Sequence, residues 1–256
     1  MWRDFHGTEY ALENGVLYLK ITNPVVAFAP PQCMNIGKES CGCILEYCKV
    51  SGLPARFCSV SAPTLEIILE MYPEAKVCTD RAWSDYLYLS DDIIKLPGRK
   101  YSGQRNHINH FMRENTKWTF RSITDSSIKD VKEFIERIAE EHDDVSPGFI
   151  ESNTKAMEAL DNLELYGQFG GVLCANGVIV GASLGEIVGD TLFVHVEKAD
   201  TAYHGAYPML MNQFARMYAQ GVKYINREED DGIEGLRTSK TSYHPTMLLD
   251  KYMVEL

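Results

Sequence analysis

Two Asn-Gly pairs, at Asn14-Gly15 and Asn176-Gly177, constrain the fold of this chain more than any other feature. Each pair lies between short stretches in which apolar and polar residues alternate. A two-residue turn of type I′ needs positive φ at both turn positions, which Asn and Gly tolerate best. We therefore expect a β-hairpin at each pair. The expected arms are Glu9–Leu12, Val16–Ile21, Gly171–Cys174 and Val178–Leu184.

The same succession of elements follows each hairpin: a strand, a helix that opens with small or turn-forming residues, and a second strand. These elements are Val25–Ala29, Lys38–Lys49 and Arg56–Val60 in the first half, and Thr191–Val196, Gly205–Gln220 and Val222–Asn226 in the second. The order recurs although the residues do not. This weak internal repeat indicates two similarly folded halves.

Periodicity predicts the second half in full. An alternating strand, Trp118–Ile123, precedes an amphipathic helix, Ser127–Glu141, for which Asp125 or Ser126 is the expected N-cap. The remaining expected elements are a helix at Phe149–Asn162, a short helix at Gly232–Thr241 and a last strand at Met247–Val254. With the hairpin and the repeat, the order becomes β-α-α-β-β-β-α-β-α-β.

Composition and charge favour a cytoplasmic protein with a sizeable core. The 256 residues are 45% hydrophobic and 24% charged, and no apolar run approaches the ~18 residues of a membrane span. The first residues lack the basic and apolar regions of a signal peptide. A formal net charge of −11 argues against broad binding to nucleic acid or to an anionic membrane, because such binding needs clustered cations.

Six of the seven cysteines lie between Cys33 and Cys78, and their spacing contains no C-x-x-C pair. Cys41, Ile44 and Cys48 recur at helical spacing, which predicts a buried helix face. We expect buried, reduced thiols. A metal or cluster site and redox chemistry are the alternatives.

One segment reverses the charge of the chain. Lys95–Arg121 holds seven of the 25 Lys and Arg residues and one of the 36 acidic residues, so it is where an anionic ligand would be steered. The segment includes GRKYSGQRNHIN at Gly98–Asn109, and a second run, YINREEDDGIEGLRTSKTSYHP, occupies Tyr224–Pro245. Both runs resemble the bacterial family named after the C-terminal domain of phosphatidylglycerol lysyltransferase.

That resemblance implies two acyltransferase domains of the GNAT type in tandem, and the order deduced for the second half is the GNAT order. We predict an α+β, three-layer fold in which mixed central sheets are flanked by helices. The first domain, residues 1–115, ends in a basic linker helix, and residues 116–256 form the complete second domain. Family members place the equivalent of Trp2-Arg3-Asp4 further into the chain, so either the start of this sequence is mis-assigned or the first domain is truncated at its N-terminus. A truncated domain would expose strand backbone, which formation of a homo-oligomer would cover.

The GNAT resemblance also implies where a donor thioester or ester would bind. In GNAT enzymes the acyl group lies between two parted strands, and a pyrophosphate lies on the N-terminus of the following helix. The residues of this sequence in those positions are Val194, Val196, Gly205, Ala206 and Asn226. The helix start departs from the usual acetyl-coenzyme A loop at Ala202 and Tyr207, and a plain glycine helix start is the alternative.

His195, Glu197 and Tyr243 are the candidate catalytic residues. Strand alternation places His195 and Glu197 on one face and Leu192, Val194 and Val196 on the other. A carboxylate beside an imidazole suits a general base near neutral pH. Tyr243 is a candidate acid for the leaving group. Structural hydrogen bonding and simple exposure are the alternatives for the strand, and packing is the alternative for Tyr243.

Substrate contacts are expected from the two family-like runs. Basic groups would contact phosphates or a carboxylate, and acids would bind an ammonium group. The candidates are Lys100, Arg105, Asn109, Arg227, Asp230, Asp231, Arg237 and Lys240. For the run at Tyr224–Pro245, the alternative is an ion-pair network that stiffens the loop. For the basic run, the alternative is a linker helix that is charged because it is half solvated.

The resulting hypothesis is a transferase that moves an acyl or aminoacyl group to an amine or hydroxyl acceptor. The resemblance implies aminoacyl-tRNA as the donor, and a coenzyme A thioester remains an alternative; no other cofactor and no metal is expected. The competing hypothesis is a non-catalytic GNAT-like binding or sensor module.

Overall fold

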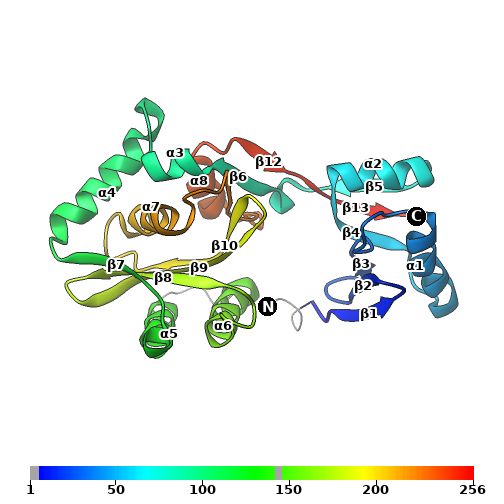
Figure 1. Cartoon of the computed structure of the whole chain (residues 1–256), viewed down its shortest axis with the longest axis horizontal. Coiled ribbons are helices and arrows are strands. Elements are labelled where there is room, and N and C mark those ends of the chain that lie inside the picture. Colours follow the sequence, from blue (N-terminus) through cyan, green and yellow to red (C-terminus); the bar gives the residue numbers. More distant parts are fainter. Residues whose placement is uncertain (1–5, 142–145) are drawn as a thin grey trace. The chain divides into compact units, whose positions relative to one another are not determined.

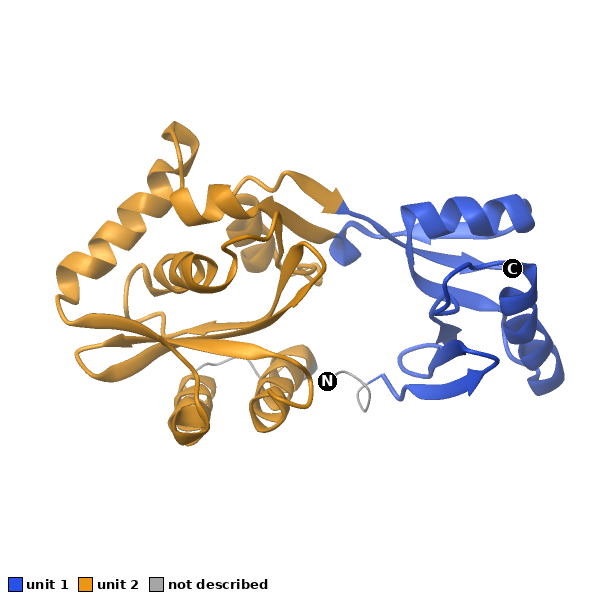
Figure 2. Ribbon diagram, viewed as in Figure 1, with its two compact units in different colours: residues 1–84, 249–256 blue, residues 85–248 orange. Residues whose placement is uncertain are grey.

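The computed structural model describes residues 6–141 and 146–256; Trp2-Arg3-Asp4 lies outside them. The chain divides into two compact units, which are described separately below (Figure 2). One comprises Met1–Ser84 with Leu249–Leu256, and the other comprises Asp85–Leu248. These bounds differ from the expected division at residue 115, because the strand and helices that follow Ser84 pack into the second sheet and its core.

The first unit combines one sheet with two helices. Its strands are β1 (Glu9–Glu13), β2 (Val16–Ile21), β3 (Ala27–Phe28), β4 (Arg56–Ser61), β5 (Lys76–Thr79) and β13 (Lys251–Glu255), and its helices are α1 (Lys38–Ser51) and α2 (Ala62–Met71). The strand order is β1-β2-β3-β4-β13-β5. The predicted helix face of Cys41, Ile44 and Cys48 is buried in the core of this unit, against Phe57 and Ile68.

The end of the chain differs from its prediction. The single strand expected at Met247–Val254 is two strands, β12 (Met247–Leu249) in the second sheet and β13 in the first. β13 lies between β4 and β5, antiparallel to both, and its Val254 is fully buried. A strand that the sequence assigned to the second half therefore completes the sheet of the first unit.

The second unit is built on a seven-stranded sheet. Its strands are β6 (Asp85–Leu89), β7 (Trp118–Ser122), β8 (Phe169–Ala175), β9 (Val178–Val188), β10 (Thr191–Ala199), β11 (Tyr224–Asn226) and β12. The order is β12-β6-β11-β10-β9-β8-β7. β10 and β11 pair in parallel. The pairs β6–β11, β7–β8, β8–β9 and β9–β10 are antiparallel.

Helices cover both faces of this sheet. They are α3 (Ser90–Lys95), α4 (Ser102–Glu114), α5 (Asp125–Glu140), α6 (Pro147–Asp161), α7 (Ala206–Tyr218) and α8 (Glu234–Thr241). α5 and α6 lie on one face and α7 lies on the other, with α3 and α4 packed against α7 (Figure 1). Two mixed sheets flanked by helices confirm the predicted α+β class.

Local signals were reliable in both units. Both hairpins form, and both residues of each Asn-Gly pair have positive φ, between 50° and 86°. The cap of α5 is an exception, since Thr124 is its N-cap in place of Asp125 or Ser126. The backbone N–H of Thr124 donates to Ser127 Oγ at 2.9 Å, a reciprocal cap with which the helix begins earlier than expected.

Candidate active site

The parallel strands β10 and β11 pair over three residues and then separate. Their last paired residues are Phe193 and Asn226. Beyond these residues β10 continues along β9. The chain after β11 instead follows β6, because the N–H of Arg227 donates to the carbonyl of Tyr86 in β6 at 3.1 Å. The sheet is therefore split between β10 and the segment after β11, and backbone groups of β10 beyond Phe193 have no β11 partner.

A β-bulge at His195 changes the direction of the side chains of β10. Val194 pairs with Gly185 of β9, and Val196 pairs with its neighbour Leu184. Paired residues point to the same face and adjacent residues of one strand point to opposite faces, so Val194 and Val196 lie on opposite faces. The predicted shared face of these two valines is therefore wrong. By the same pairing, Glu197 faces α7, together with Val194.

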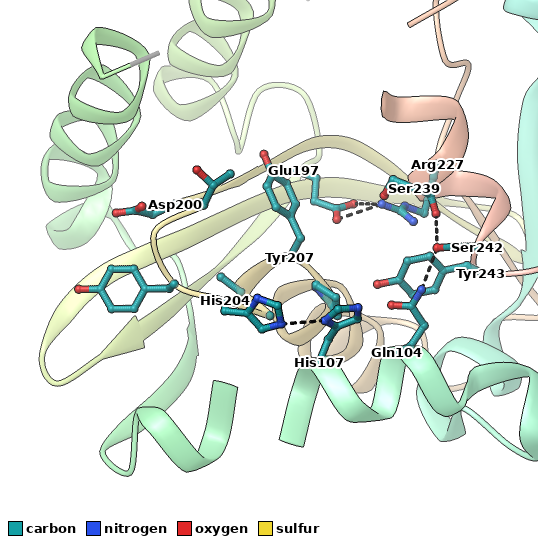
Figure 3. A pocket seen from close by; sticks show the side chains of 15 residues that line it. Gln104, His107, Glu197, Asp200, His204, Tyr207, Arg227, Ser239, Ser242 and Tyr243 are labelled. Carbon is teal, nitrogen blue, oxygen red and sulfur yellow. Dashed lines mark hydrogen bonds and ion pairs between the residues drawn. The ribbon is translucent and has the colours of Figure 1, made fainter. Parts of the chain in front are cut away.

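Glu197 lines a pocket of about 310 Å³ in the second unit, whereas His195 does not (Figure 3). The pocket is bounded by α4, the end of β10, the start of α7, the first residue after β11 and the end of α8. The side chains labelled in Figure 3 are Gln104, His107, Glu197, Asp200, His204, Tyr207, Arg227, Ser239, Ser242 and Tyr243. Three predicted residues that carry charge or a hydroxyl group thus meet here: Glu197, Arg227 and Tyr243.

A buried ion pair between Glu197 and Arg227 spans the split. Nη2 of Arg227 donates to both carboxylate oxygens, at 2.9 and 3.0 Å, and the side chains are 13% and 7% exposed. The guanidinium group lies 4.9 Å from the ring centroid of Tyr243. Burial by itself would lower the pKa of Arg227, but attraction to Glu197 outweighs it and raises the pKa, so the group stays charged.

Arg227 keeps further donors for a ligand. Its Nε and Nη1 atoms are buried and have no hydrogen-bond partner within residues 6–141 and 146–256. Buried charged donors are costly when unpaired, and such exceptions call for an explanation. A ligand oxygen that enters the pocket would satisfy them.

Tight packing of α4 against the start of α7 shapes another wall. Gly205 is the N-cap of α7 at φ 86°, and a Cβ atom there would lie 2.2 Å from the carbonyl oxygen of His107. His107 Nδ1 and His204 Nε2 are 3.1 Å apart, and Gln104 Nε2 donates to Ser242 Oγ at 2.8 Å. The predicted Ala206 is buried beside Gly205 and also lines the pocket.

Several predicted ligand contacts bind other parts of the chain. Lys240 Nζ donates to the backbone carbonyls of Arg227, Glu228 and Glu229. Asn226 is buried, donates to Asp85 Oδ2 and accepts the N–H of Glu228. These contacts hold the segment that presents Arg227, which agrees with the alternative of an internal network.

Asp230 and Arg237 form part of the same network. Asp230 is fully buried, and its carboxylate accepts two hydrogen bonds from Arg237, at 2.9 Å each, and one from Tyr86 Oη at 2.6 Å. The hydrogen bonds from Arg237 hold the pKa of Asp230 well below its usual range. Asp231, the neighbouring candidate, is exposed and has φ 51°.

We expect Asp230→Asn to lower the free energy of unfolding by about 2 kcal/mol at pH 7, the usual worth of a charged hydrogen bond. A lowered pKa stabilises the fold above the unfolded value of about 4, and this stabilisation declines as the pH falls toward the folded pKa. Urea unfolding of both proteins at pH 7 and pH 3 should therefore give a smaller difference at pH 3. An equal difference at both pH values would contradict an ionic role.

The candidates on the basic segment lie outside the pocket lining. Arg105 Nη1 donates to the carbonyls of Leu96 and Gly98, so it braces the turn before α4. Lys100 pairs with Asp92 at 3.1 Å, and Asn109 is exposed on α4. The buried side chains of the helix are instead Gln104, Ile108 and Phe111.

Among the pocket residues that the sequence did not suggest are four polar ones from three separate segments. They are Gln104, Asp200, Ser239 and Ser242. Their spacing matches no motif, and only the packing of α4 and α8 beside β10 brings them together. Asp200 accepts a hydrogen bond from Arg137 Nη1 at 3.1 Å, which fixes one rim of the pocket.

A family model described as "Phosphatidylglycerol lysyltransferase, C-terminal" matches residues 1–255. This chain belongs to that family. The match confirms the resemblance noted for Gly98–Asn109 and Tyr224–Pro245, and it places the chain in a family of acyl- or aminoacyltransferase-like proteins.

Solved structures support the same relationship. A conserved protein of unknown function from Bacteroides thetaiotaomicron is 32% identical, with a TM-score of 0.91 over 100% of this chain and 88% of that one. The C-terminal domain of a putative lysylphosphatidylglycerol synthetase from Agrobacterium fabrum has a TM-score of 0.71 at 14% identity, over 98% and 84% of the chains. A tandem GNAT protein from the clavulanic acid pathway shares the fold, at 8% identity, a TM-score of 0.51 and coverage of 95% and 80%.

A curated relative is known only as an uncharacterised protein of Mycoplasmoides gallisepticum. It is 23% identical over 175 residues, which cover 68% of this chain and 56% of the relative. The chain thus matches little more than half of that protein's length. In the part of the chain that the structure describes, no helix is both long and apolar enough to span a membrane.

Proposed function

We propose that this protein transfers an aminoacyl group from an activated ester, such as aminoacyl-tRNA, to an amine or hydroxyl acceptor in the pocket around Arg227. The observation that carries the proposal is the pair of buried donors of Arg227, at the split between β10 and β11, that have no partner among the residues described. Preorganised donors in a water-poor site stabilise the oxyanion that develops when an ester carbonyl is attacked.

The start of α7 argues for an ester donor over a coenzyme A thioester. A pyrophosphate needs free N–H groups in the first helical turn. Here the N–H of Ala206 already donates to the carbonyl of Tyr203 at 2.9 Å, and Pro208 has no N–H. Ala202 and Tyr207, which depart from the usual acetyl-coenzyme A loop, also favour an ester donor.

Basic surface charge supports an RNA-linked donor. All basic residues of Lys95–Arg121 except the half-buried Arg105 are exposed, on a chain with net charge −11. Such a strip can contact a phosphate backbone even where the whole chain is acidic. The family description, phosphatidylglycerol lysyltransferase, names an enzyme that transfers lysine, and lysine is therefore the first amino acid to test.

Glu197 and Tyr243 are the remaining reactive groups of the proposed site. The acceptor attacks the ester carbonyl, its proton passes toward the carboxylate of Glu197, and the ester C–O bond breaks with a proton going to the leaving oxygen. Burial raises the pKa of Tyr243, so its hydroxyl stays protonated and able to donate. His195 is not part of this step, because it lies outside the pocket.

The test is transfer of radiolabelled amino acids from separate aminoacyl-tRNAs to phosphatidylglycerol vesicles and to small primary amines. We expect at least one labelled amide or ester product, and no product from acetyl-coenzyme A with the same acceptors. Product formed from acetyl-coenzyme A alone would overturn the choice of donor. Tight binding of an aminoacyl-tRNA without any product would favour the binding module.

A further inference from the structure

The imidazole of His195 lies between two carboxylates on the face of the sheet opposite α7. Nδ1 is 2.7 Å from Glu228 Oε1, Nε2 is 3.0 Å from Glu186 Oε1, and the side chain is 12% exposed. A carboxylate only accepts hydrogen bonds, and a neutral imidazole carries one N–H. Beside two ionised glutamates, contacts of this length at both ring nitrogens therefore require the doubly protonated imidazolium.

The His195 cation bridges the split between β10 and the segment after β11, as the Glu197–Arg227 pair does, but on the opposite face of the sheet. His195 and Glu197 both belong to β10, and Glu228 directly follows Arg227. Glu186 is adjacent to Gly185, which packs against Phe214 of α7, so Glu186 points away from α7 and His195 lies beside it. One bridge thus joins β10 to the segment after β11 on the pocket face, and the second joins them on the opposite face.

We propose that His195 is a positioning residue whose imidazolium form clamps the split and thereby sets the position of Arg227 in the pocket. The charged groups that the described residues bring to the ring are Glu186 from β9 and Glu228 from the segment after β11. Phe193 of β10 adds a ring stacked at 6.3 Å. Loss of one ring proton would turn a nitrogen lone pair toward a carboxylate, so the clamp opens on deprotonation.

The direction of the pH effect follows from these contacts. Burial by itself would lower the pKa of His195, but the interactions with Glu228 and then Glu186 outweigh it, and the pKa lies above its ordinary value of 6.5. A raised pKa gives stabilisation that is complete below the unfolded value and is lost as the pH rises through the folded one. The clamp should therefore be closed below about pH 6.5 and should open at higher pH.

The experiment is nuclear magnetic resonance of the ¹⁵N-labelled full chain, with no donor or acceptor present. Histidine side-chain nitrogens distinguish the imidazolium from both neutral tautomers, and the Nε–H signal of Arg227 reports its surroundings. Spectra of His195→Gln and Arg227→Lys, in which one signal is missing, assign the two groups. We expect the imidazolium pattern of His195 at pH 6.5 and a shift of the Arg227 signal with the midpoint of His195.

Two variants separate positioning from a structural role. In His195→Gln, which keeps an amide donor but cannot titrate, the Arg227 signal should be independent of pH across that range. In Glu186→Gln, the loss of one carboxylate should lower the midpoint of both signals by about one pH unit. A neutral His195 at pH 6.5, or an Arg227 signal that titrates equally in His195→Gln, would overturn the proposal.

The inference rests on the proposed function only in treating the Arg227 pocket as the transfer site. The spectra require no reaction, so they test the clamp even if no transfer is found. Conversely, transfer without a coupled titration would leave the proposed function intact and remove the clamp.

Discussion

Replacing Arg227 by Lys is expected to lower the kcat/KM of aminoacyl transfer about 10²- to 10³-fold while the protein remains folded. Lysine keeps a positive charge that can pair with Glu197, but it lacks the forked guanidinium and therefore the Nε and Nη1 donors that have no partner among the described residues. Removal of one preorganised donor to an oxyanion typically has an effect of this size. Steady-state kinetics with aminoacyl-tRNA measure it, and a loss mainly in kcat would show that the donors act in the transition state.

Arg216→Lys is the matched control. Arg216 is an exposed residue of α7 that donates to Asn212 Oδ1 at 2.9 Å, outside the pocket. The same chemical change there should leave the transfer rate unaltered. The melting temperature of Arg227→Lys should stay near that of the parent, because the buried Glu197 keeps a cationic partner. Full activity of Arg227→Lys would show that Arg227 only neutralises Glu197.

Gly205→Ala should destabilise the protein by roughly 2–5 kcal/mol. The residue has φ 86°, a conformation that costs an L-residue about 1–2 kcal/mol. Its Cβ atom would also lie 2.2 Å from a backbone oxygen of α4, so the two helices would have to separate, and such overpacking costs about 1–3 kcal/mol more. Urea unfolding of the parent and variant gives the difference directly.

Gly189→Ala isolates the backbone contribution. Gly189 lies in the turn between β9 and β10 at φ 61°, and none of the residues that the structure describes has an atom within 4 Å of a Cβ built there. We therefore expect a loss of only about 1–2 kcal/mol from the left-handed backbone. Equal losses for the two variants would show that the approach of α4 to Gly205 is looser than the structure indicates.

Sequence reasoning located the elements that depend on neighbouring residues. The Asn-Gly pairs determine both hairpins because few other residue pairs adopt positive φ twice, and the alternation in Thr191–Val196 predicts β10 with its correct start. The family-like runs at Gly98–Asn109 and Tyr224–Pro245 led to the GNAT-like fold. The same runs drew attention to Arg227 and Tyr243, which the structure places in one pocket.

The prediction for His195 shows where local pattern stops being informative. Period-two alternation continues through Val194, His195 and Val196 in the sequence, but one extra residue against β9 reverses the faces. A bulge depends on how two strands align, and the amino acids of β10 carry no distinct signal for it. The partner of β13 is likewise set by a pairing between residues far apart in the chain.

The sequence by itself determined the hairpins, the helices and strands of the second half up to the last strand, and the family. Turn geometry and side-chain periodicity are properties of short segments, so they can be read from neighbouring residues. Only the tertiary structure decided which charged residues are paired with one another: Asp230 and Lys240 are bound within the chain, whereas two donors of Arg227 have no partner among the described residues. The reason is that a charged side chain suits either role, and the choice depends on the groups that distant segments bring within hydrogen-bonding distance.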